Sequence, residues 1–129
     1  EFAYINTHLD HVLETTREAQ MTVLIDCVKK VANGSPIIVT GDFNAFEDDS
    51  LVYTVACESF NDTKKVAANS DTGRTFTSYG TKKEDGTGAI DYIFISPEVE
   101  VDTYKIIRNT VQDIYPSDHY PIVADINLK

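Results

Sequence analysis

The sequence predicts a single α/β domain built around a mixed sheet. The first third of the chain has the order strand, amphipathic helix, apolar strand, which is typical of a βαβ unit with two parallel strands. Three more strand-like segments follow later without a comparable helix between them, and we expect them to run antiparallel to the first strands. The chain has 129 residues, which suits one domain with its own core and is short for two.

The first strand and the helix have separate signals. Residues 2–7 alternate imperfectly and are rich in strand formers, so we expect a strand that ends at His8. Thr15 and Glu18 match a capping box, and apolar residues then recur at helical spacing until Asn33-Gly34. The apolar residues that we expect on the buried face of this helix are Ala19, Val23, Leu24, Cys27, Val28 and Val31.

The remaining elements are predicted in chain order. Residues 36–40 are almost all apolar, as in a strand covered on both faces. A second helix is expected from Ser50 to Glu58, capped by Asp48, Asp49 or Ser50. Thr63 to Gly88 has no clear period and predicts a long loop with a short strand at Arg74 to Tyr79. Later strands are expected at Ile90 to Ser96, at Val99 to Arg108 on a sheet edge, and at Tyr120 to Asn127.

The composition narrows the range of functions. Apolar residues make up 42% and charged residues 25%, as in ordinary globular proteins. The net charge of −10 argues against a nucleic-acid surface, although a metal ion can bring a small phosphorylated substrate to an acidic site. Cys27 and Cys57 are expected to be buried thiols. We expect no membrane span, and the chain shows no targeting segment that would decide between the cytoplasm and secretion.

Polar residues gather where the predicted strands begin or end. If the later strands run antiparallel to the first two, the ends of the early strands and the beginnings of the late ones lie at the same rim of the sheet. The residues that this topology brings together are His8, Asp42, Asn44, Asp91, Asp118 and His119.

The residue types at this rim suit phosphoester chemistry. Carboxylate and amide oxygens suit Mg²⁺ or Mn²⁺, and histidines can hold or protonate a phosphoryl oxygen. Each residue also has a plainer interpretation, such as a turn for Asp42 and Asn44 or a surface histidine for His8. Arg74 in GRTF is a candidate for contact with a substrate phosphate, and its plainer interpretation is a solvated loop side chain. Asp91 is harder to dismiss, because an acid in an apolar strand needs a partner.

Four segments together resemble the endonuclease/exonuclease/phosphatase superfamily, which includes apurinic endonucleases, DNase I, inositol polyphosphate 5-phosphatases and neutral sphingomyelinases. They are INTHLDH, VTGDFNA, AIDYIFIS and PSDHYPIVADI, and they cover nearly the whole chain in the family's order. The resemblance implies a four-layered α/β/β/α sandwich and metal-dependent phosphoester hydrolysis. It also implies that residues 1–129 are the C-terminal half of such a domain, without the half that carries a glutamate metal ligand.

The resemblance also implies a role for each rim residue. His8 would contact the scissile phosphate, and Asp42 would orient or deprotonate the attacking water. Asp91 would pair with His119, which would bind and polarise the phosphoryl group. Which residue is the general base is left open. The metal ligands that the resemblance implies are Asp118, Asp42 and Asn44, with Asn44 also holding phosphate.

Three functions remain in competition at this point. The leading hypothesis is a phosphoesterase acting on a small or lipid-linked phosphate ester, with weak or no activity in this chain alone. The alternatives are a non-catalytic binding module that keeps the fold, and a nuclease whose basic surface lies in the missing half. A half-domain would leave an apolar face uncovered, so we also expect self-association through that face.

Overall fold

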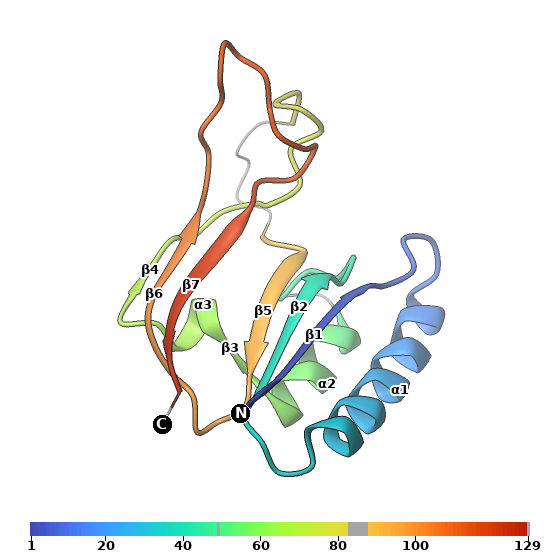
Figure 1. The fold of residues 1–129 in the computed structure, drawn as a ribbon. Helices are drawn as coiled ribbons and strands as arrows, with labels where there is room; N and C mark the ends of the chain where they lie inside the picture. The colour runs from blue at the N-terminus through green and yellow to red at the C-terminus, as the bar shows by residue number, and fades with distance from the viewer. Residues whose placement is uncertain (49, 83–87, 129) are drawn as a thin grey trace.

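The computed structural model describes residues 1–48, 50–82 and 88–128. Figure 1 shows the chain with its elements labelled. In chain order the elements are β1 (Ala3–His8), α1 (Glu14–Ala32), β2 (Ile37–Asp42), α2 (Leu51–Ser59), β3 (Asn61–Asp62), α3 (Thr63–Val66), β4 (Asn69–Ser70), β5 (Asp91–Ile95), β6 (Glu100–Ile106) and β7 (Ile122–Asn127).

The strands of the described residues form two sheets. The first has the order β1-β2-β5-β3, with β1 parallel to β2 and β5 antiparallel to β2. The second has the order β4-β6-β7, with β6 and β7 antiparallel. The predicted α/β class, with a mixed sheet and flanking helices, is confirmed. The expectation that residues 99–108 form an edge strand is wrong, because the two-residue strand β4 pairs with the other side of β6.

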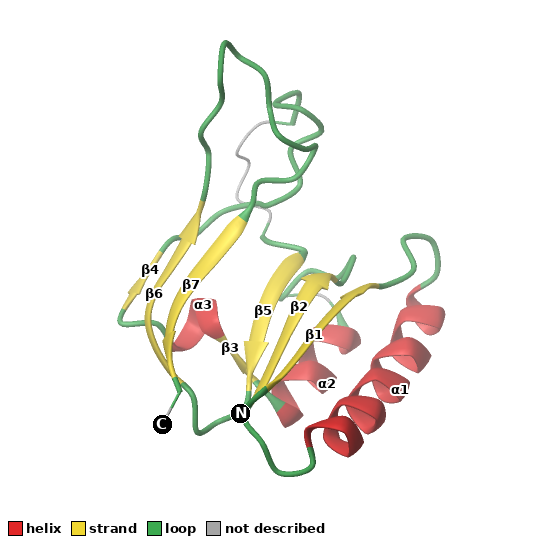
Figure 2. Cartoon of the chain, viewed as in Figure 1, coloured by secondary structure: helices red, strands yellow, loops and turns green. Residues whose placement is uncertain are grey.

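The two sheets face each other, and helices cover the far side of the larger one (Figure 2). Helices α1 and α2 pack on one face of the first sheet, where Val39, Phe43 and Phe94 belong to the main core. The opposite face contributes Ile38, Ile93 and Ile95 to a second core, against which side chains of β7 pack. The second core therefore holds the two sheets together.

Helix α1 starts without the predicted capping box. It begins at Glu14, and its N-cap residue Leu13 makes no side-chain hydrogen bond to the helix. The carboxylate of Asp10 instead accepts hydrogen bonds from the backbone N–H groups of Val12 and Leu13. Thr15 already lies inside the first turn, so it cannot serve as the cap.

The buried face of α1 also differs from the prediction. The buried residues are Met21, Ile25, Val28 and Ala32. Val23 and Val31 are 61% and 74% exposed, and Cys27 is exposed, so only part of the predicted face meets the sheet. The helix has two apolar faces and only one of them packs on the sheet. The expectation of buried thiols is wrong for Cys57 as well, which is also exposed.

For the segment after β2, some of the expected elements are confirmed and others are wrong. Ser50, one of the predicted caps, accepts a hydrogen bond from the Val52 N–H at the start of α2. The expected long loop begins with α3 and β4, and residues 74–79 form no strand but only a single bridge between Phe76 and His119. Residues 83–87 of that loop lie outside the described residues. None of the described helices is both long enough and apolar enough to cross a membrane.

Gly41 is needed where β1 and β2 run closest together. A Cβ atom at this position would lie 1.9 Å from the backbone oxygen of Thr7 on the neighbouring strand. Gly41 lies inside β2 and is needed for the close approach of the two backbones.

Candidate active site

Three neighbouring strands each present one polar side chain at the same level of the sheet. His8 of β1 lies opposite Asp42 of β2, and Asp42 lies opposite Asp91 of β5. The Nε2 atom of His8 is 3.4 Å from Oδ2 of Asp42. The register of the sheet therefore fixes the order and the spacing of this row, because each strand is hydrogen-bonded to the next.

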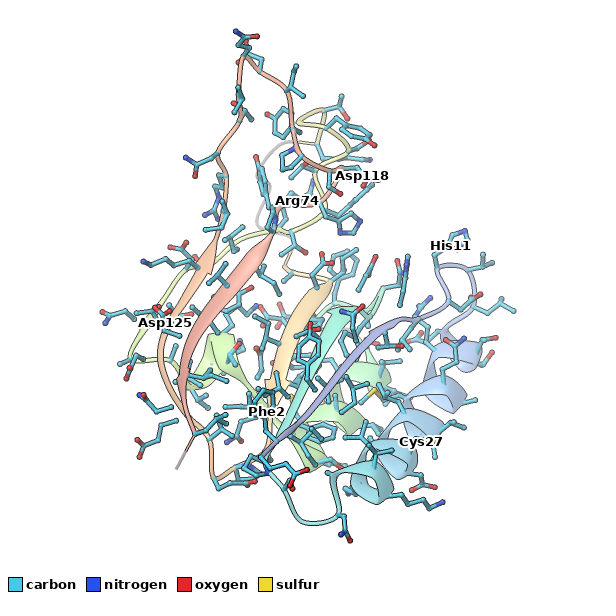
Figure 3. The ribbon with its side chains drawn as sticks, viewed as in Figure 1. Phe2, His11, Cys27, Arg74, Asp118 and Asp125 are labelled. Carbon is cyan, nitrogen blue, oxygen red and sulfur yellow. The ribbon has the colours of Figure 1, made fainter. Side chains whose placement is uncertain are left out.

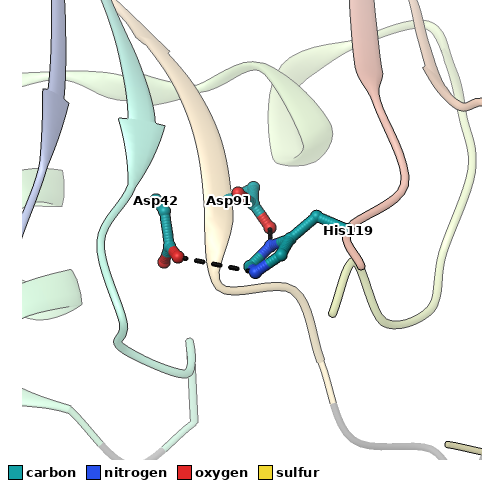
Figure 4. A group of neighbouring side chains, drawn as sticks. All are labelled: Asp42, Asp91 and His119. Atoms are coloured by element: carbon teal, nitrogen blue, oxygen red, sulfur yellow. Dashed lines mark hydrogen bonds and ion pairs between the residues drawn. The ribbon is translucent and has the colours of Figure 1, made fainter. Parts of the chain in front are cut away.

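His119 reaches this row from the second sheet. It lies just before β7, and its Nδ1 atom is 2.7 Å from Oδ2 of Asp91. Its Nε2 atom is 3.7 Å from Oδ2 of Asp42, which is too long for a hydrogen bond but close enough for a charge interaction (Figure 4). The Phe76 ring packs against the imidazole with a centroid separation of 5.0 Å. Asp91 thus fixes the orientation of His119 and leaves Nε2 directed at Asp42.

Asp42 is the most constrained carboxylate of the group. Its Oδ1 atom accepts a hydrogen bond from the backbone N–H of Asn44, and its side chain is only 14% exposed. Burial raises the pKa of this carboxyl, and the negative charge of Asp91 adds to the rise. The Asn44 N–H and the two histidines act in the opposite direction without cancelling it. Asp42 is therefore a stronger base than an ordinary aspartate.

The pKa of His119 is also raised. Burial alone would lower it, but the hydrogen bond and charge of Asp91 outweigh that effect, and Asp42 and Asp118 add to the rise. The imidazolium form is therefore favoured by the acids around it. A positively charged ring beside the cleft suits contact with an anionic phosphoryl oxygen.

Asn44 and Asp118 have other contacts. Asn44 has a left-handed backbone (φ 49°), and its side-chain Nδ2 donates to the Leu9 carbonyl, which ties the ends of β1 and β2 together. The Asp118 carboxylate accepts a hydrogen bond from the Ser117 hydroxyl. Figure 3 shows Asp118 beside the loop that carries Arg74, and the Asp118 carbonyl accepts from the Thr77 N–H. Their predicted roles as metal ligands stay predictions.

One cleft of about 460 Å³ is lined by four of the six predicted rim residues and not by Asn44 or Asp118. Its polar wall includes His8, Asp42, Asp91 and His119, and it continues along the inner face of β1 past Asn6 and Tyr4. A cleft of this volume accommodates a small phosphate ester.

A metal ion would find a partial ligand set here. Among the described residues, Asp42, Asp91 and His119 offer ligand atoms that all lie within 4.8 Å of one another. Two of the three are carboxylates, which suit a hard divalent cation. Asp91 already accepts from His119, so Asp42 is the carboxylate best placed for an ion, and a full set needs further oxygen ligands.

The sequence analysis missed one supporting residue in the expected loop and misjudged the burial of another. Thr75 is fully buried, and its hydroxyl accepts hydrogen bonds from the N–H groups of Ile90 and Asp91. It therefore fixes the backbone that carries Asp91. Arg74 is only 8% exposed, so the expectation of a solvated side chain is wrong. The segment GRTF has no strand or helix period, and its apolar Phe76 was the available signal of burial.

The match to known proteins decides the family. Residues 2–119 match the model of the endonuclease/exonuclease/phosphatase family. The chain belongs to this family. Its members are hydrolases that act on phosphoester bonds.

Similar proteins of this family are longer than the chain. An endonuclease/exonuclease/phosphatase from Bacteroides vulgatus is 30% identical with a TM-score of 0.85, and the match covers 95% of this chain and 48% of that one. A mannosyl-6-phosphatase from Bacteroides thetaiotaomicron shares the fold at 24% identity with a TM-score of 0.87, covering 99% and 52%. Nocturnin from Xenopus laevis is 29% identical over 89% of this chain and 34% of that protein. The chain thus spans about half or less of the length of these relatives.

Replacing Asp91 by asparagine should lower the pKa of His119. The change removes a negative charge 2.7 Å from Nδ1 but keeps an oxygen that can accept the hydrogen bond. A group whose pKa is raised by folding stabilises the fold fully below its unfolded value of about 6.5, and this contribution disappears as the pH rises through the folded value. The free energy of unfolding of Asp91→Asn should therefore fall mainly below the folded-state pKa of His119, where the wild-type imidazole is protonated.

Histidine NMR titration in chelator-treated buffer measures the shift, and urea unfolding at pH 5 and pH 8 measures the stability change. Asp102→Asn is the matched control, because this exposed residue bonds Asn127 and lies outside the cleft. An unchanged His119 pKa in Asp91→Asn would contradict the assigned cause.

Proposed function

We propose that these residues form the site of a divalent-metal-dependent phosphoester hydrolase. The observation that carries the proposal is the row of His8, Asp42 and Asp91 on three paired strands, with His119 oriented by Asp91 against it. The family match supports the reaction class. The substrate class that we favour is a small or lipid-linked phosphate ester, because a net charge of −10 does not suit a nucleic acid.

Each residue of the row has a role in the proposed reaction. His119 and His8 bind the phosphoryl oxygens, His119 through Nε2, since its Nδ1 is held by Asp91. Asp42 takes a proton from water as the water oxygen bonds to phosphorus. The bond from phosphorus to the leaving oxygen breaks, and the leaving oxygen takes a proton from solvent.

The proposed cation is Mg²⁺ or Mn²⁺. When bound, such an ion polarises phosphoryl oxygens as a Lewis acid. Asp42 would hold it, with Asp118 and Asn44 as the further candidates in this chain. We propose that the remaining oxygen ligands come from residues outside the 129-residue chain, so that the chain alone is weakly active or inactive.

Calorimetric titration with Mn²⁺ tests the proposed site. The wild-type chain should bind the ion, Asp42→Asn and Asp118→Ala should bind it more weakly, and Asp125→Asn should behave like the wild type. Asp125 is a suitable control because it is exposed on β7 and accepts a hydrogen bond only from the Thr103 hydroxyl among the described contacts. No heat from the wild-type chain, and none from a longer chain that contains it, would favour the non-catalytic binding module.

Hydrolysis assays with Mg²⁺ separate the enzymatic alternatives. Phosphomonoesters, phosphodiesters and single-stranded nucleic acid should be compared at equal concentrations, in this chain and in a longer chain that contains it. Preferential cleavage of nucleic acid would support the nuclease alternative instead.

A further inference from the structure

Thr75 is a buried residue with hydrogen bonds to both sides of the Asp91–His119 pair. It is fully buried and lies in a segment outside the helices and strands. Its hydroxyl oxygen accepts from the N–H groups of Ile90 and Asp91 at 3.1 and 3.2 Å. Its carbonyl oxygen accepts from the N–H of Tyr120 at 2.8 Å. One residue therefore binds both the backbone that carries Asp91 and the backbone next to His119.

The hydroxyl of Thr75 serves as the acceptor at the start of β5. The Ile90 carbonyl accepts from the Phe43 N–H, so the end of β2 holds one side of this backbone. The other side donates its two N–H groups to Thr75, which uses both acceptor positions of the hydroxyl. Removing the hydroxyl would take the acceptor away from both N–H groups, and this costs free energy where the backbone is buried.

The segment that carries Thr75 is itself paired with the segment that carries His119. Phe76 and His119 form an isolated antiparallel bridge, and their rings pack against each other. The Thr77 N–H donates to the Asp118 carbonyl at 2.8 Å. These two segments are therefore fixed to each other, and the hydroxyl of Thr75 ties both of them to β5.

The Asp91–His119 hydrogen bond depends on such a link, because its two side chains come from different sheets. Asp91 begins β5, whereas His119 precedes β7, and the Nδ1–Oδ2 distance between them is 2.7 Å. A bond of this kind is favourable up to about 3.2 Å, so a relative shift of roughly 0.5 Å between the two backbones reaches its limit. Side chains packed between the sheets set the separation of the sheets, and the bonds of Thr75 fix how the two backbones lie within it.

We propose that Thr75 is a positioning residue of this site, which keeps Asp91 and His119 at hydrogen-bonding distance through its hydroxyl and its carbonyl. It is not among the residues that line the cleft, so it acts through the pair rather than on the substrate. The inference rests on the proposed function for its effect on the reaction rate. Its effect on the Asp91–His119 pair is measurable without any enzymatic activity.

Long-range ¹H–¹⁵N NMR of the histidine rings, at fixed pH in chelator-treated buffer, tests the effect on the pair. Thr75→Val keeps the shape of the side chain but removes the acceptor, so the Nδ1 signal of His119 should move toward its position in Asp91→Asn. Thr75→Ser keeps the hydroxyl and should retain the wild-type signal. An identical Nδ1 signal in Thr75→Val and Thr75→Ser would overturn the proposal.

Thr63→Val is the matched control for Thr75→Val. Thr63 is equally buried at the start of α3, and among the described residues its hydroxyl has no hydrogen-bond partner. It also lies outside the cleft. The His119 signal should therefore stay unchanged in Thr63→Val. Equal shifts in the two valine variants would show a general effect of the substitution and would contradict the positioning role.

The reaction rate gives a second measurement, in this chain or, where this chain is inactive, in a longer chain that contains it. Thr75→Val should lower kcat by about 10- to 100-fold, because a displacement of about 1 Å can cost about 100-fold. Thr75→Ser should restore most of the rate. A kcat of Thr75→Val within about twofold of the wild type, the range of most surface changes, would overturn the proposal. If no chain hydrolyses a phosphoester, the proposed function fails, and the NMR comparison alone decides the role of Thr75.

Hydrogen exchange in the wild-type chain decides the case in which Thr75→Val does not fold. The N–H groups of Ile90, Asp91 and Tyr120 should have similar protection factors, because opening the link at Thr75 exposes all three together. Protection of Ile90 and Asp91 more than about tenfold below that of Tyr120 would mean that they open separately, and would overturn the proposal.

Discussion

Asp42→Asn should slow phosphoester hydrolysis by about 100- to 10,000-fold, the usual effect of removing a general base. The variant keeps the size of the side chain but loses the negative charge and with it the ability to accept a proton from water. The rate should be measured with Mg²⁺ in this chain or, where this chain is inactive, in a longer chain that contains it. The loss should appear in kcat more than in KM, because the proton moves in the chemical step.

The matched control for this change is Asp125→Asn, which removes the same charge from an exposed position on β7. Its rate should stay within about twofold of the wild type, as for most surface changes. A comparable rate in Asp42→Asn would assign the base to another residue and would leave Asp42 a structural role.

Phe43→Ala should lower the free energy of unfolding by about 3–5 kcal/mol, as for other buried aromatic residues. Phe43 is 1% exposed, and its ring meets Tyr92 and Phe94 edge-on with centroid separations of 5.8 and 5.1 Å. It lies between Asp42 and Asn44 in the chain and anchors both from the core side. Urea unfolding, with the midpoint lowered and the slope unchanged, measures the loss.

Two further variants test how the loss of stability depends on the burial and the volume of the side chain. Phe46→Ala is the matched control, because Phe46 is 46% exposed. This change should lower the free energy of unfolding by less than about 1 kcal/mol. Phe43→Leu retains most of the volume and should cost less than Phe43→Ala, so it remains measurable if the alanine variant fails to fold. Equal losses for Phe43→Ala and Phe46→Ala would contradict the anchoring role.

The rim of the sheet could be predicted because it follows from topology. A βαβ unit fixes β1 parallel to β2, and strand ends then meet at a common level. Asp91 was identifiable as a paired acid because its strand is otherwise apolar. The resemblance to known hydrolases supplied its partner, His119, which lies in the other sheet and is distant in sequence.

Other features could not be predicted, because they depend on packing across the molecule. A helix with two apolar faces does not reveal which one meets the sheet, and α1 buries Met21 and Ile25 rather than Val23 and Val31. Thr75 supports Asp91 from a segment without regular structure, where no periodic signal exists. The Asp10 carboxylate bonds the backbone N–H groups just before α1, and no capping box forms. The sequence is compatible with both arrangements.

The two halves of the site differ in how freely they can move. His8, Asp42 and Asp91 are spaced by backbone hydrogen bonds within one sheet, whereas His119 belongs to a segment attached to the other sheet. The gap between His119 and the row is therefore set by the side chains packed between the sheets, Ile93 and Ile122 among them. Exchanging those side chains for larger or smaller ones would change the reach of His119 without altering His8, Asp42 or Asp91. The interior between the sheets is thus a place where selection or design can adjust the position of His119 relative to the row.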